Sequence, residues 1–407
     1  MSLSAYRPVL AVPDVRTALL LGLLLRIPLW AANIILTLHV VSHLGRSYTE
    51  AGLLTTVATV ALAISGPWRG RLLDRRGLRR TLVPSLAVQA ICWSVAPFLP
   101  YPALLGLAAL AGLYVVPSFP IIRQAMIVAV PEDQRTTVLA LDSVAVELSF
   151  MIGPALGVLT ATWWGTPVAL VGCELSGVAA GLALWAVNPR LAHPEDTAPA
   201  PAPAPGPSPS RPGRRLDWVD GRVLAVVLAT AAATVVLTGS DVSIVAALRE
   251  MGHQNAIGWV LAIWGAGSAV GGVVYGSLHR RIDARWLLVG LALTTLPAAL
   301  ATSPVPFAAL LFAAGLFCAP AITATVDTLS RVVAPEHRGE AMGWHGSALT
   351  SGSALGAPLA GVAIDRIGWQ AGFVLTALAG LIPAGIAAVA WLLSALRARW
   401  SALARRR

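Results

Sequence analysis

The chain has 407 residues, of which 57% are hydrophobic and 12% are charged, and its mean hydropathy is +0.74. Soluble domains carry about 25% charged residues, so this composition excludes an ordinary soluble domain. The formal net charge of +10 is also typical of nucleic-acid-binding proteins, and the positions of the basic residues have to decide whether that class applies.

Apolar stretches long enough to cross a bilayer recur along the whole chain. A spanning helix needs about 20 mostly apolar residues. Twelve such stretches can be laid down, beginning with 18–42, 50–67 and 82–99. The first is not a cleaved signal peptide, because its apolar run is too long and further stretches follow it. The sequence therefore predicts an all-α integral membrane protein with twelve transmembrane helices in a lipid bilayer.

The basic residues are all arginines, and they gather on one side of the expected membrane. If the N-terminus is cytoplasmic, the outer loops carry only Arg46, Arg249 and Arg366, whereas most of the others fall in the inner loops and tails. This asymmetry is the positive-inside bias of membrane proteins. It predicts a multi-pass protein of the cytoplasmic membrane with both termini in the cytoplasm, and it explains the net charge without nucleic acid.

A proline-rich segment divides the chain near its midpoint. Residues 194–213 are dense in Pro and Ala and are typical of an extended linker. We therefore expect a six-helix bundle over 1–190, a cytoplasmic linker over 191–215 and a second six-helix bundle over 216–407. The halves repeat landmarks, so that Gly153, Pro154 and Gly157 match Gly356, Pro358 and Gly361. Two related six-helix halves are typical of transporters.

The loop after the second expected helix reads GRLLDRRGLRR from Gly70 to Arg80. Its spacing of glycines, acid and bases resembles the signature of the major facilitator superfamily, and the resemblance covers essentially the full chain. It implies the major facilitator fold of two six-helix bundles and a secondary transporter. It also implies a cytoplasmic latch that helps to hold the outward-facing state, formed by Gly70, Asp74, Arg75, Gly77, Arg79 and Arg80.

The fifth expected helix carries Ser149, Gly153, Pro154 and Gly157, a run similar to the antiporter motif of that family. This similarity favours export. Small residues four positions apart also pack helices in membranes, so helix packing is the alternative reading.

Several charged residues of the first half lie inside expected spans, where charge is costly and usually functional. At a rise of 1.5 Å per residue, Arg26 lies roughly 12 Å into its helix, and Asp142 and Glu147 lie roughly 9 and 16 Å into theirs. The three share one layer and could pair, and Arg123 could join Asp142. A structural ion-pair network and proton coupling both remain open. Our sharpest hypothesis is that Glu147, paired with Arg26, exchanges a proton during transport.

Polar and aromatic residues recur at helical spacing in the first and seventh expected helices, which indicates faces turned towards a cavity. These stripes are Arg26, Trp30, Asn33 and Thr37, and Thr230, Thr234, Thr238 and Asp241. The resemblance to the family implies that the first, fourth, seventh and tenth helices line the cavity. Further candidates for the substrate cavity are Tyr114, Trp264, Phe317, Thr323 and His345. Ordinary packing by threonines is the alternative.

We therefore predict a monomeric, proton-coupled exporter of a small, partly apolar organic molecule, with no cofactor and no metal. Uptake by symport is the nearest alternative, and a membrane sensor is an alternative of another class. No zinc-binding helix motif or nucleophile elbow occurs in the sequence, so an enzyme is not expected.

Overall fold

The computed structural model describes residues 6–191, 219–277, 282–334, 338–383 and 385. The described residues form helices and connecting turns, without a β-strand. By contacts the chain divides into two compact units. The first holds the helices up to Val187 and takes in His253–Ala266, and the second holds the next helix and the chain from Gly267 onward. Apart from Leu191, the expected linker over 191–215 lies outside the described residues.

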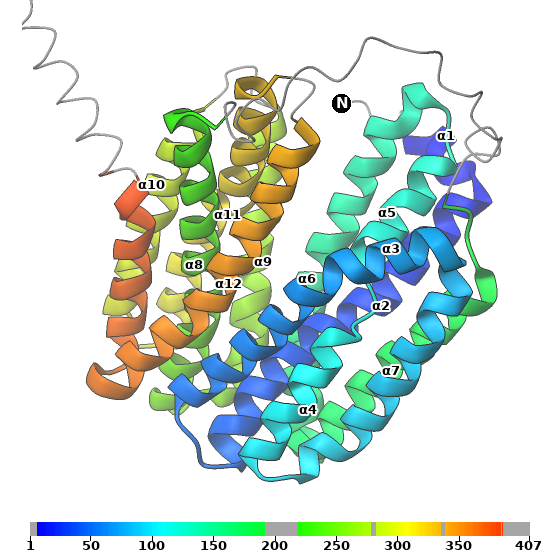
Figure 1. Cartoon of the computed structure of the whole chain (residues 1–407). Helices are drawn as coiled ribbons and strands as arrows, with labels where there is room; N and C mark the ends of the chain where they lie inside the picture. The colour runs from blue at the N-terminus through cyan, green and yellow to red at the C-terminus, as the bar shows by residue number, and fades with distance from the viewer. Residues whose placement is uncertain (1–5, 192–218, 278–281, 335–337, 384, 386–407) are drawn as a thin grey trace, which may run out of the picture. The chain divides into compact units, whose positions relative to one another are not determined.

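The first unit is built around a central helix, α2, which packs against α5, α6 and α7 (Figure 1). Its apolar core includes Ile35, Leu82, Ile122 and Leu184, all fully buried. The helices of this part are α1 (Tyr6–Ala11), α2 (Pro13–Leu38), α3 (Tyr48–Val95), α4 (Tyr101–Leu113), α5 (Ser118–Val128), α6 (Arg135–Trp164) and α7 (Thr166–Val187).

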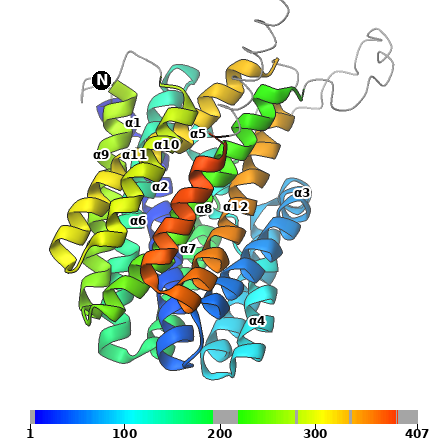
Figure 2. The ribbon, with the colours of Figure 1, turned by 90° about the vertical axis from the view of Figure 1, so that its left-hand side faces the viewer.

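The second unit is built around α8, which packs against α10, α11 and α12. In Figure 2 the green α8 and the orange α12 run side by side, as they do in Figure 1. The labelled helices of the later part are α8 (Gly221–Glu250), α9 (Ile257–Ser277), α10 (Ala284–Thr295), α11 (Pro304–Val332) and α12 (Arg338–Ile367).

Ten helices among the described residues are long and apolar enough to cross a membrane. Two shorter apolar helices, Ala284–Leu300 and Trp369–Pro383, bring the total to the expected twelve. The predicted all-α, twelve-helix membrane fold is confirmed. Large apolar side chains such as Leu20, Ile64 and Ile91 are more than half exposed, as side chains that face lipid should be.

The second and third spans both lie within α3, which consists of two helices joined at a kink. Gly77 has φ 75° and ψ 170° inside α3. A residue other than glycine would be strained at this φ, so the glycine permits the chain to turn between Tyr48–Ser65 and Arg76–Phe98.

The fourth span is discontinuous, which the sequence analysis did not foresee. Helix α4 ends at Leu113 and α5 begins at Ser118, although the apolar span runs from Tyr101 to Val128. Pro117 precedes Ser118, and a proline disfavours a helical conformation in the residue before it. Irregular backbone at membrane depth is tolerated where protein or a cavity surrounds it.

Glycines bring α6 close to α2. A Cβ atom at Gly153 would lie 2.8 Å from the carbonyl oxygen of Ile27, and one at Gly157 would lie 2.8 Å from that of Ala31. These separations are too short for any side chain, so the crossing depends on glycine at both positions.

The second unit repeats this crossing between α8 and α12. Gly352 lies against the carbonyl oxygen of Ala231, and a Cβ atom at Gly356 would lie 2.7 Å from that of Val235. The equivalents of Gly153 and Gly157 are therefore Gly352 and Gly356. The predicted match of Gly153 with Gly356 is therefore wrong by about one helical turn, because the prolines of the two halves do not lie at equivalent positions.

Candidate functional site

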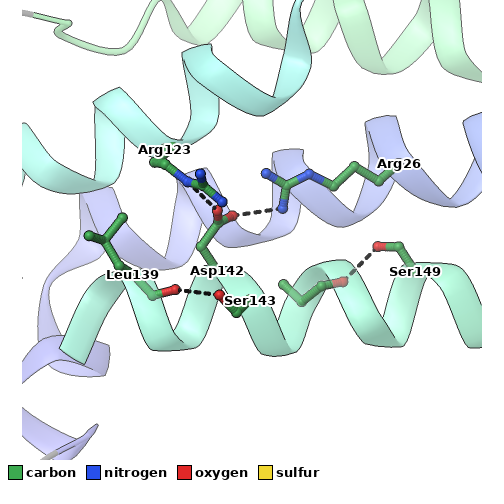
Figure 3. A network of polar contacts seen from close by, with 7 residues as sticks. Arg26, Arg123, Leu139, Asp142, Ser143 and Ser149 are labelled. Atoms are coloured by element: carbon green, nitrogen blue, oxygen red, sulfur yellow. Dashed lines mark hydrogen bonds and ion pairs between the residues drawn. The ribbon is translucent and has the colours of Figure 1, made fainter. Parts of the chain in front are cut away.

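The centre of the first unit holds a buried ion-pair network that joins three helices (Figure 3). Arg26 of α2 donates from Nη1 to Oδ1 of Asp142 on α6 at 2.7 Å, and both side chains are fully buried. Arg123 of α5 donates from Nε to Oδ2 of the same carboxylate at 3.2 Å, and its side chain is 51% exposed. The carboxylate of Asp142 is thus shared by two guanidinium groups, as Figure 3 shows.

Arg26 also contacts an aromatic ring from the start of α5. Arg26 lies under the ring of Phe119, with its Cζ atom 4.8 Å from the ring centroid. Phe119 is the second residue of α5, so the break in the fourth span places this ring against Arg26. The sequence analysis missed Phe119, and the available signal was the Pro117 that ends the irregular segment.

Aromatic side chains continue from Arg26 along α2. Trp30 lies one turn further on and meets Phe150 of α6 edge to face, with ring centroids 5.1 Å apart. Phe150 also contacts Trp264 at 5.8 Å. Trp264 belongs to the part of α9 that groups with the first unit. Two of the predicted cavity residues, Trp30 and Trp264, therefore belong to one aromatic cluster centred on Phe150, which the sequence analysis did not single out.

Glu147 lies on the same helix as Asp142 and is half-buried. It has an interaction with another group of the protein. The ion pair that the structure shows for Arg26 is with Asp142, so the pairing of Glu147 with Arg26 stays a prediction.

The signature loop contributes a contact inside the first unit. Arg79 donates from Nε and Nη2 to the carbonyl oxygens of Trp185 and Ala186, each at 3.1 Å. These carbonyls belong to the last turn of α7, where a positive charge also interacts favourably with the helix dipole. Arg80 is exposed. The side chains of Asp74 and Arg75 and the surroundings of Gly70 are not among the parts that the structure describes.

The remaining candidates of the first unit separate into two groups. Thr37 is buried and donates to the carbonyl oxygen of Asn33 at 3.3 Å, which is a contact within its own helix. Asn33 itself is half-buried. Tyr114 lies at the end of α4, where the guanidinium of Arg69 is 5.8 Å from its ring centroid. None of these contacts joins the network around Asp142.

In the second unit, threonines of the predicted stripe on α8 donate hydrogen bonds to carbonyl oxygens of their own helix. Thr234 donates to the carbonyl oxygens of Thr230 and Ala231 at 3.0 Å, and Thr238 donates to that of Thr234 at 2.9 Å. Asp241 is partly exposed on the same helix. The threonine contacts therefore favour the packing alternative for this stripe.

The candidates on α11 and α12 lie in different environments. His345 is buried and forms a hydrogen bond with Thr325 of α11 through Nε2 at 2.9 Å. Phe317 packs against Gly290 of α10, and Thr323 is exposed. No group of three or more potential metal ligands occurs within the described ranges.

Comparisons with known proteins agree on the family. The model of the Major Facilitator Superfamily matches residues 18–248 and again 224–406. No curated protein matches the sequence significantly.

Solved transporter structures share the fold at low identity. A bacterial homologue of the human lysosomal transporter Spinster, inward-facing and unoccupied, is 14% identical with a TM-score of 0.71, covering 92% of this chain and 96% of that one. The nucleoside transporter NupG is 13% identical with a TM-score of 0.73, covering 92% and 98%. A bacterial homologue of the iron transporter ferroportin is 13% identical with a TM-score of 0.69, covering 91% and 96%. With two family matches that together span nearly all of its length, the chain belongs to the Major Facilitator Superfamily.

Proposed function

We propose that this chain is a proton-coupled exporter of a small, partly apolar organic molecule. Family membership indicates a secondary transporter. Proton-coupled export is supported by α6, which holds both Asp142 and Glu147 and bears the antiporter-like run with Gly153 and Gly157. Because α6 also crosses α2 at those glycines, a change in its charge can act directly on the contact between the two helices.

Topology and gating complete the proposal. The arginine asymmetry supports a cytoplasmic-membrane protein with both termini inside. The signature loop would gate the cycle, and the contact of Arg79 with the end of α7 anchors one end of that loop. The protein would act as a monomer. The similar structures are named for nucleoside, iron and lysosomal transport, so they point to no single substrate.

In this proposal Glu147 takes up and releases the coupled proton. An acid inside a span changes protonation when its surroundings change from apolar to solvated, as happens when bundles alternate between two states. Asp142 is the poorer carrier, because two arginines already bind the two oxygens of its carboxylate.

The test begins with growth protection of cells that express the protein against a panel of toxic compounds. A protective compound is then followed in inverted membrane vesicles with an imposed pH gradient. We expect the gradient to drive its accumulation in exchange for protons, and we expect Glu147→Gln to abolish this while sparing downhill counterflow.

Glu132→Gln is the matched control, since Glu132 is an exposed acid near the start of α6 whose side chain is 90% exposed. Substrate movement in the same direction as the proton would instead show symport. Gradient-driven accumulation by the Glu147→Gln protein would exclude Glu147 as the coupling site.

A further inference from the structure

Arg26 uses only part of its hydrogen-bonding capacity. Its Nη1 atom bonds Asp142, whereas its Nε and Nη2 atoms are buried and have no hydrogen-bond partner among the described residues. Nε–H and the N–H of Nη2 that lies beside it point from the same edge of a guanidinium group. This edge is the fork that binds a carboxylate or a phosphate through two parallel hydrogen bonds.

The surroundings of this fork favour an anion. The three side chains of the network, two guanidinium groups and the carboxylate of Asp142, sum to one positive charge. Helix α5 begins beside Arg26, as the contact with Phe119 shows, and no side chain caps its first turn. The N-terminus of a helix carries a partial positive charge, so it adds to the attraction for an anion.

A further donor and apolar surface lie next to the fork. The indole Nε1–H of Trp30 is buried and has no partner within the described part of the chain. Trp30 follows Arg26 by four residues on α2, so the two side chains share one helix face. Phe150, which meets Trp30 edge to face, extends this face with an aromatic ring.

We propose that Arg26 binds the carboxylate of an aromatic organic acid, with Trp30 donating a further hydrogen bond and Phe150 contacting the ring. This inference rests on the proposed function and names the chemical class of its substrate. A carboxylate carries one negative charge, which balances the single positive charge of the network. A phosphate monoester carries about −1.5 to −2 at neutral pH and would leave an excess of negative charge.

The test is isothermal titration calorimetry on the full-length protein in detergent. The probes are three aromatic compounds that share a ring system: 2-naphthoate, its neutral amide 2-naphthamide, and 2-naphthyl phosphate. We expect 2-naphthoate to bind at least tenfold more tightly than either other probe, roughly the value of one hydrogen bond to a charged group.

Two variants assign the preference to this site. Arg26→Lys keeps the charge but removes the fork, and it should weaken 2-naphthoate binding about tenfold to a hundredfold. Trp30→Phe removes only the indole N–H and keeps a ring, so it should weaken 2-naphthoate several-fold without changing 2-naphthamide. Arg46→Lys is the control, because Arg46 is half-exposed in an ion pair with Glu50.

Equal binding of the acid and the amide, no binding of either, or tighter binding of the phosphate would overturn the assignment. An unchanged preference in Trp30→Phe would do so even if Arg26→Lys failed to fold. Failure of the proposed function is distinguishable, since it would appear as absent transport in vesicles from a protein that still prefers 2-naphthoate in detergent. Transport restricted to neutral or cationic compounds would instead contradict only the inference.

Discussion

The same helix crossing occurs once in each unit, and the two copies differ in what lies beside the glycines. Gly153 reaches Ile27, and Gly352 reaches Ala231. Arg26 precedes Ile27 as Thr230 precedes Ala231, so Thr230 is the counterpart of Arg26.

The position of Asp142, the partner of Arg26, also has an uncharged counterpart in the second unit. Asp142 lies as far before Gly153 as Ala341 lies before Gly352. Ala341 is 1% exposed and packs in an apolar cluster with Val223, Val226 and Leu329. Among the described residues, the first crossing therefore joins glycines with buried charges, and the second joins glycines with an apolar residue in the place of Asp142. Because α8 and α12 cross with uncharged residues at both counterpart positions, Thr230 and Ala341, the charges of the first crossing favour a role beyond packing.

The largest expected effect is on the charged crossing. Asp142→Asn should destabilise the folded protein by about 3–5 kcal/mol, because it leaves Arg26 buried without a counter-charge. Unfolding in detergent followed by circular dichroism would measure this loss. A change below about 1 kcal/mol would mean that water or another group already balances Arg26.

The glycines should matter equally in both crossings. Gly157→Ala and Gly356→Ala should each cost about 1–3 kcal/mol, since a Cβ atom at either position would press on a backbone carbonyl of the facing helix. Gly172→Ala is the control, because nothing lies within 4 Å of a Cβ atom there. It should be neutral or stabilising by up to about 1 kcal/mol through helix propensity. Unequal costs for Gly157 and Gly356 would break the equivalence of the crossings.

The smallest effect is expected at the uncharged counterpart of Arg26. Thr230 is fully buried and donates to the carbonyl oxygen of Val226 at 2.8 Å within its own helix. Thr230→Val should therefore cost about 1 kcal/mol or less and leave transport unchanged. Loss of transport in a stable Thr230→Val protein would show that the second crossing is functional too.

Much of the charged site could be predicted from the sequence, because helical rise fixes the depth of a residue. The placing of Arg26 and Asp142 in one layer and the approach of Arg123 to Asp142 both agree with the structure. Depth does not fix direction around the helix axis. Asp142 and Glu147 are five residues apart, which turns their side chains about 140° from each other, so the acid that faces Arg26 could not be selected.

Other features depended on contacts that sequence patterns do not reveal. The break between Leu113 and Ser118 was missed because its segment is as apolar as the helices beside it. The equivalence of Gly153 with Gly352 was missed because α12 is rich in small residues, and only the facing carbonyl of α8 singles out one of them.

The most direct test of a role in transport for the ion-pair network replaces its two buried charges together. Replacing a buried ion pair by apolar residues of similar size is often neutral or stabilising, so the double variant Arg26→Met with Asp142→Leu should fold and melt near the wild type. We predict that this folded protein has lost transport of the protective compound in vesicles, both downhill and gradient-driven. Transport at the wild-type rate by the double variant would contradict a role of the ion-pair network in transport and leave it only the role of holding the helices together.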